Sequence, residues 1–401
     1  MNKTKLKEKV RTLVPDIRFV RKSIAKMRYR SISKRFIDEN EIRAAEENSE
    51  LKKDFVKKYT EKWPDIYKRT LKEYDKLLNW TVDPQKRKDL ERLKTDIHFC
   101  KYAYGFVPYE YVSLELENKD MDTRKTYVSN RDTHVYQCMI NDLTETAVTS
   151  DKVKTYETYK KYFHRDAIEV VSEKDYDKFK KFISAHPVFV KKPVYECGGR
   201  GIERVDVREK GSEPKKVFDE MVAAGKHICE EVVKQSEKIA VFNSSSVNTV
   251  RIVTLTTKNG VEPFFSVMRF GRGGTFVDNA SSGGVFAGVD INTGTVNTDA
   301  YDKGNDVYAA HPDTGVTFKG FKIPKWDELV ETCKEMSGMN KKLKAYTWDM
   351  ALAELPDGSE KWVVIECNAM GEFLIQIVSK KGIKADFESK MRNMDLMVDF
   401  K

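Results

Sequence analysis

The chain has 401 residues, of which 40% are hydrophobic and 11% aromatic, so it can bury a core and form two or three domains. It contains no run of about 18 apolar residues, which excludes a transmembrane helix, and its first residues lack the apolar centre of a secretory signal. Its six cysteines lie far apart without a CxxC pair, which disfavours disulfides and zinc sites. We therefore expect a cytoplasmic protein with reduced thiols.

The net charge of +9 is concentrated near the N-terminus. Thirteen basic and two acidic residues lie between Met1 and Arg35, so this segment carries +11 and the remainder of the chain −2. Such local basicity indicates an anionic partner rather than a nucleic-acid-binding fold, and we expect no nucleic acid. Two interpretations stay open: the segment lies on the anionic inner face of a membrane, or it packs on the rest of the protein with its lysines in water.

The first hundred residues carry helical patterns. Apolar residues recur at helical spacing over residues 10–27, and a second pattern covers about 51–78, where Pro64 can divide the helix. A third pattern covers about 83–104. Residues 127–148 carry no clear pattern. This part of the chain therefore predicts a mainly helical region.

From residue 151 onwards the pattern changes to helices and strands in alternation, which predicts an α+β fold. Two hairpins have strong turn signals, Asn259-Gly260 in the first and Pro356-Asp357-Gly358 in the second. Strands are expected at 227–233, 250–256, 262–270, 345–355 and 362–368, and helices near 153–163, 172–183, 214–224 and 325–338.

A glycine-rich linker joins two strand-like runs between Val188 and Val207. Lys191 and Lys192 precede it, and it contains Gly198, Gly199, Arg200 and Gly201. Glycines let backbone N–H groups approach a phosphate closely, and lysine offsets the phosphate charge. The helical motifs GxxxxGK[ST] and GxGxxG are absent, so this loop would fold over phosphates as a flap. Taken alone, a plain hairpin turn with exposed lysines explains it more simply.

Acidic residues further along the chain strengthen the interpretation of this loop as a phosphate-binding flap. The strand-like run Ile228–Val233 carries Glu230 and Glu231, and Glu237 follows, which suits a hinge that binds adenine through backbone groups and ribose through a carboxylate. Asp349 lies on one expected strand, and Glu366 and Asn368 lie two residues apart on the next, so both face the same side. Carboxylate and amide oxygens are hard ligands that suit Mg²⁺.

In this order the motifs resemble the ATP-grasp family over about residues 151–371. The resemblance implies two α+β subdomains, at 151–236 and 237–401, whose antiparallel sheets hold ATP between them. The sequence itself predicts a basic, mainly helical region at 1–95 and a small substrate-side domain at 96–150. This long helical N-terminus departs from the usual layout of the family, in which a compact α/β domain comes first. Cofactors would be ATP and two Mg²⁺ ions held by Asp349, Glu366 and Asn368. The nucleotide-binding residues implied are Lys152, Lys192, Gly198, Gly199, Arg200, Gly201, Glu230, Glu231, Val233 and Glu237.

Two further runs, Ser246–Arg251 (SVNTVR) and Val277–Gly284 (VDNASSGG), resemble the sugar-transfer associated branch of that family. The branch implies a carboxylate–amine ligase that forms an acyl phosphate, releases ADP and phosphate, and serves polysaccharide biosynthesis. Arg251 and Lys192 would be catalytic. Its small-molecule substrates, a carboxylate and an amine, would be contacted by Arg269, Arg272, Asn279, Ser281 and Ser282. Two alternatives stay open: a phosphotransferase with the same nucleotide site, and a non-catalytic nucleotide-binding adaptor.

Overall fold

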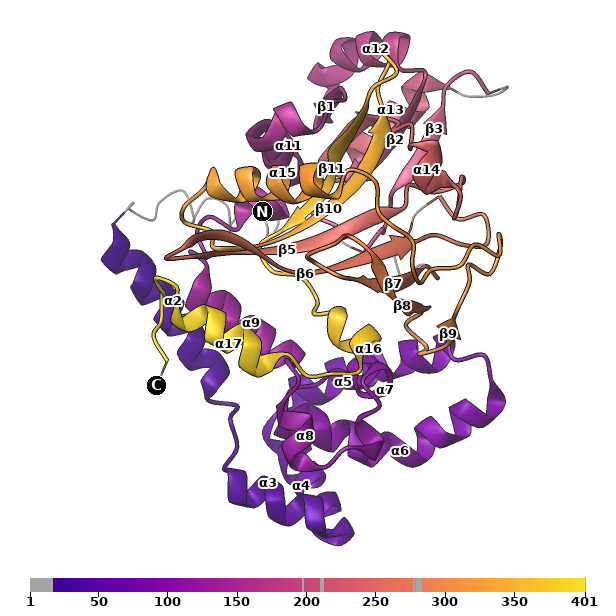
Figure 1. Ribbon diagram of the computed structural model, residues 1–401. Helices are drawn as coiled ribbons and strands as arrows, with labels where there is room; N and C mark the ends of the chain where they lie inside the picture. Colours follow the sequence, from indigo (N-terminus) through magenta and orange to yellow (C-terminus); the bar gives the residue numbers. More distant parts are fainter. Residues whose placement is uncertain (1–16, 197, 210–212, 277, 279–282, 401) are drawn as a thin grey trace.

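The computed structural model describes residues 17–196, 198–209, 213–276, 278 and 283–400. Helices fill its N-terminal part, and strands begin at residue 167 (Figure 1). The helices are α2 Arg18–Ser33, α3 Glu39–Glu47, α4 Ser49–Lys62, α5 Pro64–Trp80, α6 Pro84–Ala103, α7 Pro108–Ser113, α8 Met121–Lys125, α9 Asn130–Ile140, α10 Ala147–Ser150, α11 Lys152–Tyr159, α12 Tyr176–Ala185, α13 Pro214–Ala224, α14 Glu237–Ala240, α15 Trp326–Gly338, α16 Ile375–Ser379 and α17 Lys384–Arg392. The strands are β1 Ala167–Val170, β2 Val188–Pro193, β3 Glu203–Asp206, β4 His227–Glu231, β5 Thr249–Thr257, β6 Gly260–Phe270, β7 Val285–Val289, β8 Val296–Tyr301, β9 Val307–Tyr308, β10 Ala345–Glu354 and β11 Glu360–Asn368.

The strands form two antiparallel sheets. The smaller has the order β1-β4-β2-β3, and the larger has the order β11-β10-β5-β6-β7-β8-β9. In Figure 1 the smaller sheet lies at the top with α12 and α13, and the larger sheet crosses the middle of the molecule. The predicted α+β fold, with antiparallel sheets after a helical N-terminal region, is confirmed.

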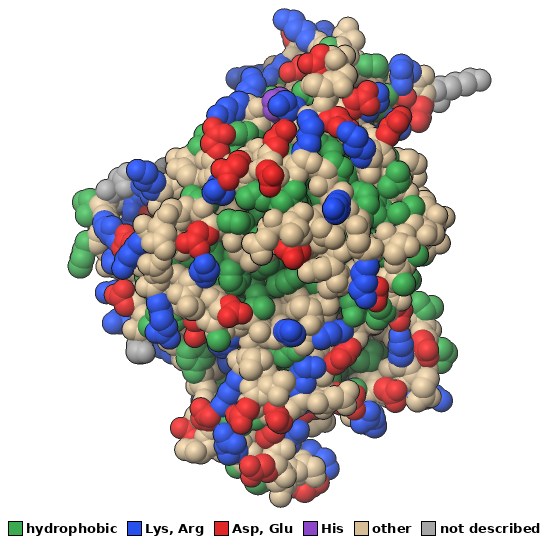
Figure 2. Space-filling view, in the orientation of Figure 1, with side chains coloured by type: hydrophobic (Ala, Val, Ile, Leu, Met, Phe, Trp, Pro, Cys, Tyr) green, Lys and Arg blue, Asp and Glu red, His purple; other side chains and the backbone are tan. Residues whose placement is uncertain are grey.

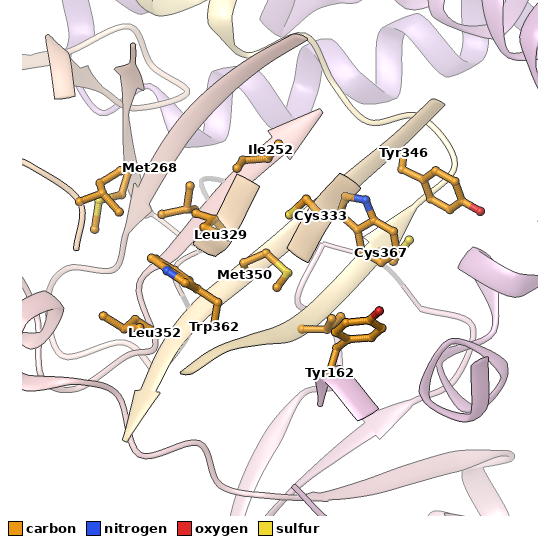
Figure 3. Close-up of a cluster of buried hydrophobic side chains, with 14 of the residues drawn as sticks. Tyr162, Ile252, Met268, Leu329, Cys333, Tyr346, Met350, Leu352, Trp362 and Cys367 are labelled. Carbon is orange, nitrogen blue, oxygen red and sulfur yellow. The ribbon is translucent and has the colours of Figure 1, made fainter. Parts of the chain in front are cut away.

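One face of the larger sheet is covered by α15 and forms an apolar core. Ile252 and Met350 from the sheet lie in this core with Leu329 and Cys333 from α15, and all four are fully buried (Figure 3). Burying side chains of this size stabilises the fold by about 1.5–3 kcal/mol each. This face is therefore structural.

The opposite face of the larger sheet meets the N-terminal helices. Val267 and Phe286 belong to the same buried cluster as Phe99 of α6. Val267 is the cross-strand partner of Arg251, so both side chains point to this face. The N-terminal helices and the polar residues of the larger sheet therefore share one face of the sheet.

Several local predictions are confirmed, and one is adjusted. The second helical pattern is divided at Pro64, with α4 ending at Lys62 and α5 beginning at Pro64. In the first hairpin Thr257 pairs with Gly260, so the turn is Lys258-Asn259 and Gly260 begins β6 with φ of +115°. Residues 127–148, which lacked a clear pattern, form α9 and α10.

Two global features complete the fold. Five cysteines, namely Cys100, Cys138, Cys229, Cys333 and Cys367, are buried free thiols, and Cys197 lies outside the described residues. Within the part of the chain that the structure describes, no helix is both long enough and apolar enough to cross a membrane. The four regions predicted from the sequence, 1–95, 96–150, 151–236 and 237–401, stay predictions.

Candidate active site

A cavity of about 90 Å³ lies between the two sheets. It brings together residues that are far apart in the sequence. The smaller sheet and its neighbours contribute Lys152, Arg165, Val190, Lys192, Ile202, Glu230 and Glu231, the connection to the larger sheet contributes Val232, Val233 and Val247, and the larger sheet with its loops contributes Thr249, Arg269, Phe276, Asp278, Ile365 and Glu366. Seven predicted site residues therefore line one cavity: Lys152, Lys192, Glu230, Glu231, Val233, Arg269 and Glu366.

An ion-pair cluster forms the floor of this cavity. Glu230 on β4 accepts from Lys192 Nζ on β2 at 2.9 Å and from Arg165 Nε at 2.9 Å. A second nitrogen of Arg165 donates to the carbonyl oxygen of Val364 on β11 at 2.7 Å. Arg165 therefore ties the smaller sheet to the larger one at the cavity. Arg165 was not among the predicted site residues. Glu230, predicted to lie at the adenine hinge, pairs with two cations in the structure.

Burial and charge shift the pKa values in this cluster. Burial opposes ionisation of Glu230, but the charges of Lys192 and Arg165 outweigh it and lower the pKa of Glu230 to about 2. Burial also lowers the pKa of Lys192, and the charge of Glu230 only partly offsets this. The carboxylate is therefore ionised at neutral pH and holds the lysine against the cavity.

An apolar slot adjoins the ion pairs. Val233, Val247 and Ile365 pack against a buried cluster formed by Ala351, Ala353 and Val363 of the larger sheet. Glu231, which also lines the cavity, accepts a hydrogen bond from the backbone N–H of Asp166 at 3.1 Å. The cavity thus has a charged part beside an apolar wall, a combination that suits a ligand with a flat ring and an anionic group.

Arg251 lies deeper, in a network with Asp349. Arg251 Nε and one terminal nitrogen bind the two oxygens of Asp349 at 2.8 and 2.9 Å, and Arg269 binds Asp349 at 3.1 Å. Burial opposes ionisation of Asp349, but the two arginines outweigh it and lower its pKa. Both oxygens of this predicted metal ligand are therefore engaged by guanidinium groups.

The other two predicted metal ligands are better placed. Glu366 lines the cavity, and among the described residues its side chain has no hydrogen bond or ion pair. Asn368 lies two residues further along β11, so it faces the same side, although it does not line the cavity. Within the described residues no group of three or more His, Cys, Asp and Glu side chains is arranged to hold a metal. All three stay predicted ligands: Glu366 and Asn368 offer oxygen donors of the kind that Mg²⁺ prefers, whereas the oxygens of Asp349 are already engaged by arginines.

The predicted flap joins β2 to β3. Gly198, Gly199 and Gly201 have φ values of +70°, +77° and +69°, which L side chains rarely adopt. A Cβ atom at Gly201 would lie 2.8 Å from Cγ of Pro193, so the turn is also tightly packed. Arg200 forms an exposed ion pair with Glu196 at 3.1 Å. Of the loop residues described, Ile202 lines the cavity, and the glycines and Arg200 do not.

Other predicted residues lie elsewhere or cannot be placed. Glu237, predicted to bind ribose, is exposed at the first turn of α14 and does not line the cavity. Arg272 also lies outside it and pairs with Asp302 at 3.0 Å. Asn279, Ser281 and Ser282 lie outside the described residues.

Asp278 lies in the VDNASSGG run but was not among the predicted site residues. Asp278 is buried, lines the cavity and accepts from the backbone N–H of Thr249 at 3.0 Å, and it lies 3.3 Å from Arg269. Burial raises the pKa of Asp278. The two runs SVNTVR and VDNASSGG meet through the hydrogen bond of Thr249 with Asp278, so their pairing could have drawn attention to this acid.

The N-terminal helices reach the same polar face. Lys303 Nζ lies 3.8 Å from the Glu372 carboxylate and 4.7 Å from the centre of the Tyr109 ring. Desolvation opposes ionisation of Glu372, but the charges of Lys303 and Arg251 outweigh it and lower its pKa. Residues before 151 thus contribute to the surroundings of Arg251.

Comparison with protein families identifies the family of this chain. A model of the family described as "Sugar-transfer associated ATP-grasp" matches residues 131–391, more than half of the chain. The chain belongs to this ATP-grasp family. The matched range contains every residue that lines the cavity between the sheets. No curated protein sequence matches the chain.

Solved structures with a similar arrangement include several ligases and synthetases. N5-carboxyaminoimidazole synthetase from Staphylococcus aureus complexed with ADP is 10% identical with a TM-score of 0.34, covering 56% of this chain and 44% of its own. L-amino acid ligase from Bacillus licheniformis is 13% identical with a TM-score of 0.37, covering 62% and 48%. D-alanine-D-alanine ligase from Helicobacter pylori is 11% identical with a TM-score of 0.38, covering 64% and 62%. The chain spans about half the length of the first two proteins.

Proposed function

We propose that this ATP-grasp protein is an ATP-dependent carboxylate–amine ligase that works through an acyl phosphate. The observation that carries the proposal is the convergence of Lys152, Arg165, Lys192 and Arg269 with Glu366 in one cavity beside an apolar slot. Cations offset phosphate charge, and the apolar slot suits the adenine ring. Membership of the ATP-grasp family supports ATP as the nucleotide.

Each side chain has a role that follows from its position. Lys192 is held by Glu230 at the cavity floor, so its ammonium group is oriented before a phosphate arrives. Lys152 enters from the start of α11, where its Nζ already donates to the carbonyl oxygen of Val194 at 3.4 Å. Glu366 and Asn368 would hold Mg²⁺, which offsets the charge of nucleotide phosphates when it is bound.

The proposed reaction has two steps. An oxygen of the substrate carboxylate attacks the γ-phosphorus of ATP, the bond from that phosphorus to the β–γ bridging oxygen breaks, and ADP leaves. The amine nitrogen then attacks the acyl carbon, a C–N bond forms, the C–O bond to phosphate breaks, and one proton passes from nitrogen to solvent. Arg269 and, behind it, Arg251 are the guanidinium groups available to steady the acyl phosphate.

The cavity must widen before a nucleotide enters. Its volume of about 90 Å³ is smaller than the roughly 300 Å³ that small-molecule sites usually provide. The contact of Arg165 with Val364 holds the sheets together here, and the loop between β2 and β3 carries Ile202 over the cavity. We expect ATP to separate the sheets at these two places.

We further propose that the carboxylate is a sugar acid or an amino acid used in polysaccharide biosynthesis. The support is the description of the family as associated with sugar transfer. Arg269 and Asp278, which lie 3.3 Å apart at the cavity wall, offer one group for a carboxylate and one for an amine or a hydroxyl.

The reaction can be tested with purified full-length protein. ATP, Mg²⁺ and mixtures of uronic acids or amino acids with amines are incubated with the protein, and ADP, phosphate and new amides are measured. We expect ADP, phosphate and an amide in equal amounts for a productive pair. A stable phosphate ester in place of the amide would indicate a phosphotransferase, and no turnover with any pair despite nucleotide binding would indicate an adaptor.

Three variants make this test specific. Lys192→Ala and Glu366→Ala should each lower turnover by about 10²–10³-fold, the usual cost of one well-placed transition-state group. Lys191→Ala is the matched control, because Lys191 pairs with Glu203 at 3.0 Å and does not line the cavity. Activity that survives both Lys192→Ala and Glu366→Ala would refute the site.

Membrane contact by the N-terminal region is a separate proposal. In α2, Ala25 and Ile32 are buried and Arg21 pairs with Asp142 at 2.6 Å, whereas Phe19 and Met27 are 78% and 62% exposed. One side of α2 thus packs on the protein while apolar and basic residues face outward, which suits an anionic lipid surface. Sedimentation with vesicles containing phosphatidylglycerol should capture the protein, and Phe19→Asp should abolish capture. Equal capture of both proteins would exclude this contact.

A further inference from the structure

A second cavity, of about 450 Å³, lies among the N-terminal helices. It is lined from α2, α5, α6 and α9 and from the short segments beside them, and it shares no lining residue with the cavity between the sheets. Its charged lining consists of Arg28, Arg35, Arg69, Lys101 and Arg131, with His134 and a single acid, Glu73. Five cations thus face one acid around this space.

The cations of this helical cavity differ from those on the nearby surface. Over the helices at the lower end of Figure 2, acidic and basic side chains are interspersed. Many of them form ion pairs, such as Lys58 with Glu41 at 2.7 Å. Among the described residues, by contrast, Arg28, Arg35 and Lys101 have neither an ion pair nor a side-chain hydrogen bond, and Arg69 has only a backbone carbonyl at 3.2 Å.

The wall of the cavity holds its central arginine rigidly. Arg131 donates to the carbonyl oxygens of Tyr102 at 3.0 Å and Ala103 at 2.8 Å, at the end of α6. Its Nε is buried and has no hydrogen-bond partner among the residues that the structure describes. A Cβ atom at Gly105 would lie 2.2 Å from the Cβ of Arg131. The arginine therefore packs directly against the backbone of Gly105, and a side chain at position 105 would clash with it.

Burial and neighbouring charges lower the pKa values of two cations in this cavity. Burial and then the charges of Arg69 and Arg28 lower the pKa of Arg35. Burial lowers the pKa of Lys101, and the charge of Glu73 only partly offsets it. Cations brought together without matching acids repel one another, and a bound anion removes that cost.

We propose that this helical cavity binds a small polyanion with phosphate or carboxylate groups, at a site separate from the nucleotide cavity. Arg28, Arg35, Arg69 and Lys101 would bind the anionic oxygens, since guanidinium and ammonium groups form their strongest hydrogen bonds with such oxygens. Trp63, which also lines the cavity, offers an apolar surface for an organic part of the ligand.

The test uses the full-length protein, with inorganic pyrophosphate and citrate as probes. Calorimetric titrations are run at constant ionic strength without Mg²⁺. Lys101→Met and Arg69→Gln should each weaken binding by about tenfold or more, the equivalent of one charge-assisted hydrogen bond. Lys88→Met, an exposed lysine on the same helix as Lys101, should bind as the unmodified protein does. Lys192→Ala removes a phosphate-binding group of the nucleotide cavity, so it reports whether a probe binds there instead.

Binding of either probe with this pattern supports the site, and the preferred probe tells whether phosphate or carboxylate oxygens are favoured. Arg69→Gln alters an exposed side chain, so it gives an answer even if Lys101→Met proves unstable. Binding of neither probe would overturn the proposal. Equal affinities across all the variants, or a loss only in Lys192→Ala, would overturn it as well.

Discussion

The two cavities of this protein differ in how many acidic side chains accompany their cations. Between the sheets, Lys192 and Arg165 share Glu230, and Arg269 lies beside Asp278 and Asp349. In the helical cavity, five cations face only Glu73. Paired cations are oriented in advance but must share their charge with a new anion, whereas unpaired cations offer their full charge. The comparison indicates a site built for positioning in the first case and for electrostatic capture in the second.

The largest expected effect comes from breaking the pairing between the sheets. Glu230→Gln leaves the buried charges of Lys192 and Arg165 without their partner, so it should lower the free energy of unfolding by about 3–5 kcal/mol. Urea unfolding at neutral pH measures this. Glu203→Gln removes a largely exposed carboxylate that pairs with Lys191. It should lower the free energy of unfolding by less than about 1 kcal/mol. Similar losses of unfolding free energy in the two variants would mean that the buried ion pairs of Glu230 stabilise the fold no more than an exposed ion pair does.

Protonation of Glu230 at low pH should break its ion pairs with Lys192 and Arg165 without a mutation. The pKa of Glu230 is about 2 in the folded protein against an ordinary value of 4.5, so its ionisation stabilises the fold above about pH 4.5. As the pH falls from 4.5 towards 2, about 3 kcal/mol of stability should be lost, and Glu230→Gln should lack this part of the pH dependence. Parallel curves for the two proteins would contradict the pairing.

The walls of the two cavities should respond differently to an added methyl group. Gly105→Ala places its Cβ 2.2 Å from the Cβ of Arg131 in the helical cavity and should cost about 2–3 kcal/mol. Gly201→Ala, in the loop over the nucleotide cavity, meets Pro193 at 2.8 Å and should cost about 1–2 kcal/mol. Gly315→Ala has a similar φ of +72° and open space, so its thermal unfolding gives the cost of the backbone alone. A larger loss of stability in Gly201→Ala than in Gly105→Ala would contradict the tighter packing inferred for the wall of the helical cavity.

The smallest expected effect is on salt dependence. Between about 0.01 M and about 0.15 M ionic strength, pyrophosphate binding at the helical cavity should weaken by roughly fivefold, because unpaired and partly exposed cations are screened. ADP binding should weaken less, since three of the four cations between the sheets, Arg165, Lys192 and Arg269, are buried and already paired. Titrations of both ligands across this range measure the two slopes. Equal slopes would remove the electrostatic distinction.

Much of the fold could be predicted from local sequence signals. Pro64 divides a helix and Gly260 begins a hairpin strand, because turns depend on neighbouring residues. The order of the motifs along the chain predicted the ATP-grasp family, which the family match confirms. These features did not require knowledge of distant contacts.

The chemistry of the site was harder to predict because it depends on contacts across the sheets. Arg165 lies in no motif, and its role arises only because β4 and β11 approach each other there. Asp349 was predicted to bind metal, yet its oxygens are engaged by Arg251 on the adjacent strand β5 and by Arg269 on β6, one strand further along the sheet. The helical cavity was missed because its cations come from four separate helical regions and form no sequence pattern.

The measurement that tests the account most directly is the titration of Mg²⁺ and ADP into the purified protein by calorimetry. We predict that the unmodified protein binds one ADP, that Lys192→Ala weakens binding by about tenfold or more, and that Lys191→Ala changes it by less than about twofold. Equal affinities for the unmodified protein and Lys192→Ala, or a larger loss in Lys191→Ala, would contradict a nucleotide site between the two sheets.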